Sequence, residues 1–245
     1  MFLTYKPIGI SPLEHLSDLK KQEKIKSKKS SYAGRLDPMA HGLMIYLSDE
    51  YCKKQDNFIG LDKTYKFKIA FGITTDTYDI LGKIKKISSE KINIEVLKSI
   101  INNYIGSKKQ YYPPYCSYKI NGKPLWKHSL DGTLDFDLPS KIITIYNLNI
   151  LNNYFLDFEN FRLDVLNKIS NLKSNNFRND EIMSGWEKIK MDNVLILDII
   201  ADVSSGTYIR SLCNEIGCEI GVGAIAYDIF RIKIGDYKLD EKYYN

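Results

Sequence analysis

Metal-binding side chains are scarce in this sequence. Its 245 residues include four cysteines without a Cys-x-x-Cys pair, and only three histidines, His15, His41 and His128, which lie far apart. Zinc sites need several closely spaced Cys and His side chains. We therefore expect no metal site, and we expect the thiols to be reduced, as in an intracellular protein.

Long apolar runs are also lacking. No stretch approaches the ~20 apolar residues that cross a bilayer, and the N-terminus lacks the basic start, apolar core and small-residue cleavage site of a signal peptide. The sequence predicts a cytoplasmic protein with no membrane partner.

Charge of one sign is only mildly in excess. Lys+Arg number 35 and Asp+Glu 30, which gives a net charge of +5, and the 44% hydrophobic and 27% charged residues are typical of a globular protein. The length suits one large domain or two small ones. A charge of this size is a weak indication of a nucleic-acid partner. The lysines are clustered, however, at Lys20 to Lys29, Lys83 to Lys86 and Lys108-Lys109. Solvated helix ends and loops are the plain interpretation of such runs, and phosphate-contacting loops are the alternative.

Hydrophobic periodicity predicts strands and helices without a regular βαβ repeat. Tyr65, Phe67, Ile69 and Phe71 alternate with polar residues from Thr64 to Ile73, as in a half-buried strand. Further strands are expected over 142–151 and, in a central position, over 194–203. Helices are expected after the capping box Ser11-Pro12-Leu13-Glu14, from Asn93 to a C-cap at Gly106, and from Ile209. This mixture favours an α+β fold with a central antiparallel or mixed sheet flanked by helices and loops.

One segment, from about Tyr154 to Asp192, is polar and Asn-rich. We interpret it as a partly helical insertion. It could cover a bound substrate or bind a partner, and a solvated spacer is an equally open alternative.

The most distinctive motif in the sequence has an acidic residue between two glycines. Asp37 lies in the run Tyr32-Ala33-Gly34-Arg35-Leu36-Asp37-Pro38-Met39-Ala40-His41-Gly42, and the following proline disfavours helical geometry at Asp37. Such a loop can present one carboxylate at a surface. Taken alone, an ordinary Asp-Pro turn is the more common interpretation.

Several further blocks occur in a fixed order with this loop. They are Lys6-Pro7-Ile8-Gly9-Ile10-Ser11, Asp62-Lys63-Thr64-Tyr65, Gly72-x-x-Thr74-x-Asp76-Thr77-x-Asp79-x-x-Gly82, Gly206-Thr207-Tyr208-Ile209-Arg210 and Arg231-Ile232-x-x-Gly235. Together with Gly34-Arg35-Leu36-Asp37-Pro38, they resemble the TruB family of pseudouridine synthases.

The resemblance implies a single catalytic domain of the pseudouridine synthase fold over residues 1–245. It implies a cofactor-free, monomeric enzyme that isomerises uridine to pseudouridine in RNA, most closely the T-loop uridine at position fifty-five of tRNA, with the tRNA T-arm as partner. Many relatives continue into a small RNA-binding domain of the PUA type. The chain ends at Asn245, so we expect RNA docking to rely on the catalytic domain.

The resemblance also implies roles for individual residues. Asp37 would be the nucleophile and Arg210 its charge partner, and Tyr65 would stack on the flipped base and handle a proton. The plain alternatives are a solvent-facing helix residue for Arg210 and a structural aromatic for Tyr65.

Four more residues are expected at the substrate: Lys6, Tyr32, Gly34 and Tyr208. Lys6 is similar to a lysine that lines the family's active-site loop, where it would support the neighbouring backbone, although a plain surface lysine remains open. Tyr32 takes the place where tRNA-modifying members commonly carry a histidine that fills the space of the flipped base.

Two rival interpretations remain at this level. The same fold could bind RNA as a chaperone or assembly factor without chemistry, or the chain could be an unrelated basic scaffold protein.

Overall fold

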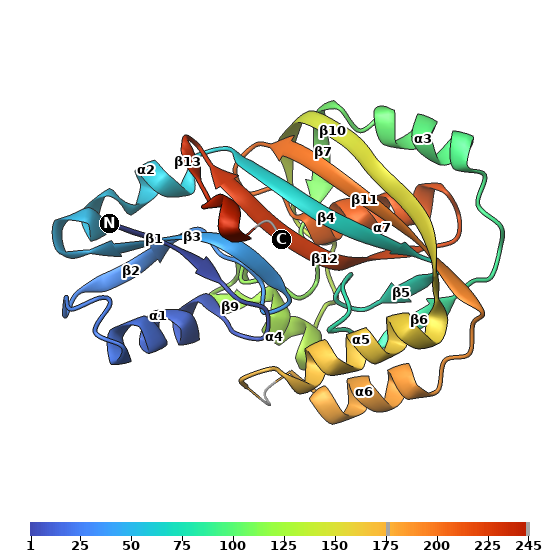
Figure 1. Ribbon diagram of the computed structural model, residues 1–245, viewed down its shortest axis with the longest axis horizontal. Coiled ribbons are helices and arrows are strands. Elements are labelled where there is room, and N and C mark those ends of the chain that lie inside the picture. Colours follow the sequence, from blue (N-terminus) through green and yellow to red (C-terminus); the bar gives the residue numbers. More distant parts are fainter. Residues whose placement is uncertain (175–176, 244–245) are drawn as a thin grey trace.

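The computed structural model describes residues 1–174 and 177–243 and is built around one nine-stranded sheet (Figure 1). Its main path runs β1-β3-β12-β4-β11-β10-β7, with β2 paired to β3 and β13 to β12. The strands are β1 (Phe2–Lys6), β2 (Ser30–Ala33), β3 (Ala40–Ser48), β4 (Lys63–Phe71), β7 (Gly106–Tyr111), β10 (Ser140–Asp157), β11 (Asn193–Val203), β12 (Ala224–Ile234) and β13 (Tyr237–Lys238). β3 and β12 run parallel, and the other neighbours are antiparallel. The mixed central sheet and the α+β class are therefore confirmed.

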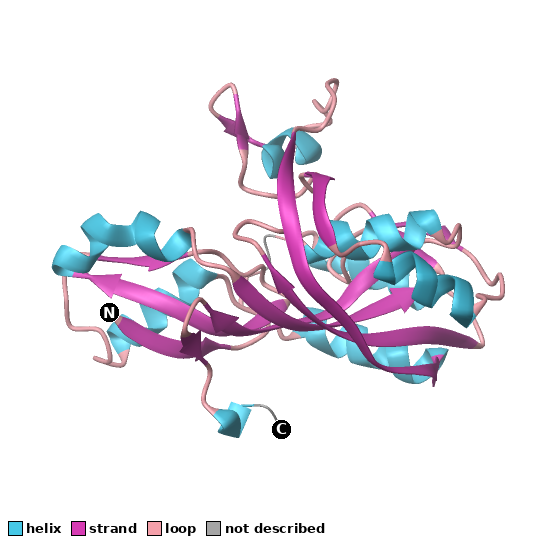
Figure 2. Cartoon of the chain, turned by 90° about the horizontal axis from the view of Figure 1, so that it is seen from above, coloured by secondary structure: helices cyan, strands magenta, loops and turns pink. Residues whose placement is uncertain are grey.

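Helices and two small hairpins surround this sheet. The helices are α1 (Pro12–Lys21), α2 (Gln55–Ile59), α3 (Ile94–Asn102), α4 (Leu125–Leu130), α5 (Phe158–Ser170), α6 (Asn179–Glu187) and α7 (Ile209–Glu219), with 3₁₀ turns over Asp49–Lys54 and Glu241–Tyr243. The hairpins are β5 (Ile73–Thr75) with β6 (Ile84–Ile87), and β8 (Lys119–Ile120) with β9 (Lys123–Pro124). Figure 2 shows the β8–β9 hairpin and α4 projecting from the body of the sheet. Within the described residues, no helix has both the length and the apolar character needed to cross a bilayer.

Local sequence signals explain most of these boundaries. Ser11 and Glu14 form the expected capping box at the start of α1, with Glu14 N donating to Ser11 Oγ at 3.2 Å and Ser11 N donating to Glu14 Oε2 at 2.7 Å. The predicted C-cap at Gly106 was wrong. α3 ends at Asn102 with Asn103 as its C-cap, and Gly106 opens β7 with φ +110°.

Strand β4 lies at the centre of the sheet and carries the predicted alternation. Tyr65, Phe67 and Ile69 belong to the larger core, which α3 and α7 cover on one face. Ala70 faces a second core on the opposite face of the sheet. β4 pairs with both β11 and β12, so the start of β4 is held between two long strands.

The polar segment before β11 is a packed pair of helices, α5 and α6, which lie side by side (Figure 1). Phe161 and Trp186 are fully buried in the second core, and Trp186 Nε1 donates to Ile80 O at 3.1 Å. The solvated-spacer alternative is therefore wrong for the described part of this segment, because its apolar side chains cover a sheet face. Residues 175 and 176 of the predicted span lie outside the described residues. That the segment is an insertion relative to other family members stays a prediction.

Truncating the tryptophan tests how much these helices contribute to stability. We expect Trp186→Ala to lower the free energy of unfolding by about 3–5 kcal/mol, because it leaves a large cavity and an unpaired Ile80 carbonyl. Urea unfolding followed by circular dichroism measures the change. A loss below about 1 kcal/mol would show that the helices are only loosely attached.

Candidate active site

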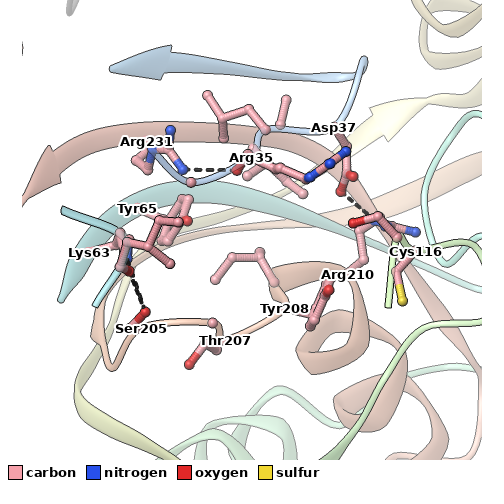
Figure 3. Close-up of a pocket in the computed structure, with 18 of the residues that line it drawn as sticks. Arg35, Asp37, Lys63, Tyr65, Cys116, Ser205, Thr207, Tyr208, Arg210 and Arg231 are labelled. Atoms are coloured by element: carbon pink, nitrogen blue, oxygen red, sulfur yellow. Dashed lines mark hydrogen bonds and ion pairs between the residues drawn. The ribbon is translucent and has the colours of Figure 1, made fainter. Parts of the chain in front are cut away.

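A cleft of about 540 Å³ opens beside the start of β4 (Figure 3). It lies between the loop that carries Asp37, the first residues of β4, and the turn that leads into α7. The sequence-predicted residues that line it are Tyr32, Gly34, Asp37, Tyr65, Tyr208 and Arg210. The fold thus brings together six of the seven predicted site residues.

Asp37 and Arg210 form an ion pair at this cleft. Arg210 Nε donates to Asp37 Oδ2 at 2.7 Å. The side chain of Asp37 is 38% exposed and that of Arg210 only 3%. The carboxylate is therefore open to a ligand, whereas its cation is enclosed in protein.

Backbone hydrogen bonds hold the loop that carries Asp37 in place. Ala40 N donates to Asp37 O at 3.0 Å, and Gly9 N donates to Pro38 O at 2.9 Å. Gly34 has φ +76°, a left-handed conformation that a glycine adopts without strain. These contacts fix the direction in which the carboxylate points.

Arg210 is fixed by partners on two other loops. Its Nη1 donates to Thr77 O at 2.7 Å and its Nη2 to Tyr115 O at 3.0 Å. Its Nε also lies 3.8 Å from Asp79 Oδ2. Burial by itself would lower the pKa of Arg210, but Asp37 and Asp79 outweigh that effect and raise the pKa, so the guanidinium stays charged. The solvent-facing alternative for Arg210 is wrong.

Asp79 is a buried carboxylate that the sequence analysis did not single out. It is 5% exposed and accepts hydrogen bonds from the Thr77 hydroxyl and, at 3.0 Å, from Leu81 N. Burial raises its pKa to about 6, against the lowering effect of Arg210 and Thr77. Arg210 therefore serves two acids, one open to the cleft and one enclosed.

Tyr65 contributes an aromatic wall to the cleft. It is the third residue of β4 and only 7% exposed. Figure 3 shows it toward one end of the cleft, with Asp37 and Arg210 toward the other. Tyr65 belongs to the core and lines the cleft at the same time, so the structural and functional interpretations require the same placement.

Arg231 is a second buried arginine that the sequence analysis missed as a functional group. It is 1% exposed, and its Nη1 donates to Arg35 O at 3.0 Å while its Nε donates to Leu43 O at 2.9 Å. It thereby ties β12 to the loop that carries Asp37. The signal available in the sequence was an arginine directly between Phe230 and Ile232, in a predominantly apolar stretch.

Gly42 permits this close approach between β3 and β12. Its φ is +112°, and a Cβ atom there would lie 2.2 Å from Arg231 O. Any larger residue would separate the parallel strand pair beneath the Asp37 loop.

Lys6 lies beneath the site and not in the cleft. It is 0% exposed, and its Nζ donates to Pro7 O at 2.9 Å and to Ile10 O at 2.7 Å. The surface-lysine alternative is therefore wrong, and a contact between Lys6 and the substrate stays a prediction. These two hydrogen bonds hold residues 6–10 in a tight loop. Gly9 of this loop donates its backbone N–H to Pro38 O, next to Asp37.

The buried amine of Lys6 makes stability depend on pH. Burial lowers its pKa to about 7 from the usual value of 10.5. Between these values the unfolded chain binds more protons than the folded one, so the contribution of Lys6 rises with pH, by at most about 1.4 kcal/mol per pH unit. We expect the stability deficit of Lys6→Met to be larger at pH 9.5 than at pH 7. Urea unfolding at both pH values tests this, and a deficit that shrinks with pH would contradict it.

The two remaining predicted residues are tyrosines of the cleft. Tyr32 is half-buried, meets the Tyr46 ring edge-on with centroids 6.4 Å apart, and has the Arg35 guanidinium 5.8 Å from its own centroid. The backbone of Tyr208 is clamped by Gln110, which accepts from Tyr208 N at 2.8 Å and donates to Tyr208 O at 3.1 Å. Burial raises the pKa of Tyr208, which keeps its phenol protonated.

Potential metal ligands do not gather in the described part of the chain. Residues 1–174 and 177–243 contain no group of three or more His, Cys, Asp or Glu side chains arranged to hold an ion.

Comparison with known proteins identifies the family. The profile described as "TruB family pseudouridylate synthase (N terminal domain)" matches residues 21–168, which is more than half of the chain. The chain belongs to the TruB family. Among the relatives of this TruB-family chain, tRNA pseudouridine synthase B of Aquifex aeolicus is 31% identical over 236 residues, which cover 96% of this chain and 68% of that protein. The protein of the same name from Blochmanniella pennsylvanica is 29% identical, with coverage of 97% and 75%.

Solved structures support the same fold. A Cbf5-Nop10-Gar1 complex contains a chain that matches with a TM-score of 0.59 and 18% identity over 97% of this TruB-family chain. An H/ACA ribonucleoprotein bound to a substrate RNA matches with a TM-score of 0.57 and 17% identity. The TruB-family chain spans about half the length of these chains, 49% and 48%. At this identity the likeness shows the fold alone.

Proposed function

We propose that this TruB-family chain isomerises uridine to pseudouridine in tRNA, and that its target is the T-loop uridine at position fifty-five. The observation that carries the proposal is the Asp37–Arg210 pair, an open carboxylate held by a buried cation in a cleft that Tyr65 also lines. Relatives that cover 96% and 97% of the chain are named tRNA pseudouridine synthase B, which supports this choice of reaction and substrate.

Asp37 is the proposed nucleophile. The isomerisation breaks the bond between the ribose and a ring nitrogen of uracil, turns the base, and joins the ribose to a ring carbon. That carbon loses its proton, and the ring nitrogen released from the ribose gains one. A carboxylate can assist without first losing a proton, because a free Asp with a pKa near ~3.9 is already ionised at neutral pH. Arg210 then offsets the desolvation of the carboxylate and fixes its direction once RNA covers the cleft.

Tyr65 is the proposed platform for the flipped base. Extruding a base costs a few kcal/mol, and stacking on one aromatic ring returns about 1–3 kcal/mol. Phosphate contacts and RNA shape must supply the remainder. Tyr32 and Tyr208 add further aromatic surface to the same cleft, and Gly34 allows close approach to the Asp37 loop. We assign all three to substrate binding.

Lysines near the cleft suit an RNA partner. Lys141 lies with its Nζ 5.2 Å from the ring centroid of Tyr208, which lines the cleft. The projecting β8–β9 hairpin adds Lys119 and Lys123. We propose that the T-arm docks across this side of the molecule, that the enzyme acts as a monomer, and that it works in the cytoplasm.

A comparison of two RNA hairpins tests the proposed substrate. Purified protein is incubated with a T-arm stem-loop and with an anticodon stem-loop of equal length, and the digested nucleosides are separated by liquid chromatography with mass detection. We expect pseudouridine in the T-arm only. Equal conversion of both hairpins would contradict the T-arm assignment, and tight binding without conversion would support the RNA-chaperone alternative.

A further inference from the structure

The two-helix segment (158–187) reaches the active site through Arg178. This residue precedes α6 and has φ +62°, a left-handed conformation that is uncommon for a non-glycine residue. Its side chain is only 18% exposed. An uncommon backbone conformation of this kind persists only where the surrounding contacts hold it. The contacts of the Arg178 guanidinium are therefore the relevant ones.

The guanidinium of Arg178 joins two loops. Its Nη1 donates to Asp76 Oδ2 at 2.7 Å and to the Tyr115 hydroxyl at 2.9 Å, and its Nη2 lies 3.3 Å from Asp76 Oδ1. Its Cζ lies 4.6 Å from the centroid of the Tyr115 ring. The ion pair with Asp76 is bidentate, and the Asp76 side chain is only 13% exposed. Together with the cation–π contact, this makes the interaction stronger than an ordinary surface ion pair.

These are the same two loops that hold Arg210. Thr77, whose carbonyl accepts from Arg210 Nη1, directly follows Asp76 in the chain. Tyr115 binds Arg178 through its hydroxyl and Arg210 through its carbonyl. Arg178 therefore contacts one of the two residues whose carbonyls orient the Arg210 side chain, and the chain neighbour of the other.

The same segment also supports the other side of the ion pair. Lys173 N donates to Gly9 O at 2.8 Å, and Gly9 N donates to Pro38 O, next to Asp37. Lys173 Nζ is further paired with Asp18 of α1 at 2.5 Å. The segment thus touches the supports of Asp37 through Gly9 and the supports of Arg210 through Arg178.

We propose that Arg178 is a positioning residue, which keeps the Thr77 and Tyr115 carbonyls in place so that Arg210 meets Asp37 in the reactive geometry. Arg178 acts through these loops and does not touch the reacting atoms. The kinetic consequence rests on the proposed function. The geometric consequence, the order of the Arg210 guanidinium, does not depend on it.

Variants of Arg178 test the kinetic consequence, with Arg162→Ala as the matched control. Arg162 lies on the same segment, where it pairs with Glu159 at 2.6 Å and donates to Glu187 O at 2.9 Å, contacts confined to the segment itself. At saturating T-arm RNA, we expect Arg178→Ala to slow single-turnover conversion about 10-fold or more, since small misplacements of catalytic groups have effects of this size. The Kd for RNA should change less than about 2-fold, Arg178→Lys should recover part of the rate, and Arg162→Ala should match the wild type.

A purely structural role predicts a different pattern. Rates that fall equally in Arg178→Ala and Arg162→Ala, in step with their melting temperatures, would overturn the proposal. An unchanged rate in Arg178→Ala would do the same.

A spectroscopic measurement separates this proposal from the proposed function. In protein with ¹⁵N-labelled arginine, the Nε–H of Arg210 is held by Asp37 and should exchange slowly with solvent. We expect Arg178→Ala to accelerate this exchange at least about 10-fold and Arg162→Ala to leave it within about 2-fold. Unchanged exchange in Arg178→Ala refutes the positioning role whatever the activity. If the wild type makes no pseudouridine while the exchange responds as expected, the proposed function fails and the positioning role stands.

Discussion

Asp37→Asn is expected to lower the rate of pseudouridine formation by at least about 1,000-fold while the protein still binds RNA. Asparagine keeps the size of the side chain and an oxygen that can accept from Arg210 Nε, but it is a poor nucleophile. The Asp79 carboxylate remains 3.8 Å from Arg210 Nε, so the buried guanidinium keeps a charge partner in this variant. Single-turnover conversion and filter binding on the same T-arm RNA measure the two effects, and we expect the Kd to stay within about 3-fold of the wild type.

The matched control for Asp37→Asn is Asp240→Asn. Asp240 follows β13 and does not line the cleft. It forms a surface ion pair with Lys242 at 3.0 Å. Its substitution should leave both the rate and the Kd unchanged. Full activity in Asp37→Asn would remove the proposed nucleophile from the mechanism, and so would equal losses in both variants.

Arg210→Met is expected to cause the largest combined loss of stability and activity. It removes a fully buried cation, leaves the Thr77 and Tyr115 carbonyls without the donors of the Arg210 side chain, and takes away the charge partner of Asp79. Breaking one side of a buried ion pair costs about 3–5 kcal/mol of unfolding free energy. Conversion of uridine should fall by about 1,000-fold or more, because Asp37 loses the group that orients it.

The stability loss in Arg210→Met has a defined pH dependence. Burial already raises the pKa of Asp79 to about 6, and loss of Arg210 raises it further. A carboxyl group with a raised pKa in the folded state destabilises the fold increasingly as pH rises above its unfolded value of 3.8. We therefore expect the deficit of Arg210→Met to be smaller at pH 5 than at pH 8, as measured by urea unfolding.

A double variant separates stability from catalysis. Arg210→Met combined with Asp79→Asn removes the unpaired buried charge, so it should regain part of the lost stability but none of the activity. Recovery of activity in this variant would show that Arg210 serves only the fold. A deficit that is independent of both pH and Asp79 would contradict the pairing described here.

Short-range patterns in the sequence predicted the parts of the fold that local chemistry determines. The alternation in β4, the capping box at Ser11 and the helix that begins at Ile209 all follow from neighbouring residues. The ordered motif blocks placed Asp37, Tyr65 and Arg210 at one site, and the structure brings these residues to one cleft. The catalytic roles assigned to them stay predictions.

The buried charges could not be predicted in the same way, because their partners are distant in sequence. Arg231 donates to Leu43 O across 188 positions, and Lys6 is enclosed by a loop whose path depends on Pro38 and Gly9. A lysine in a short N-terminal segment gives no sign of burial. The two-helix segment was correctly predicted to be partly helical, but its burial was not predicted, because its Asn-rich composition masked the apolar spacing of Phe161, Val165 and Ile169, which α5 buries on one face.

Mapping pseudouridine in a complete unmodified tRNA is the most direct test of the proposed reaction. The tRNA is incubated with wild-type protein or with Asp37→Asn, and each uridine is then examined by chemical labelling and primer extension. The wild type should convert the T-loop uridine at position fifty-five and no other, and Asp37→Asn should convert none. Pseudouridine at that position with Asp37→Asn, or its absence with folded wild-type protein, would contradict the proposed function.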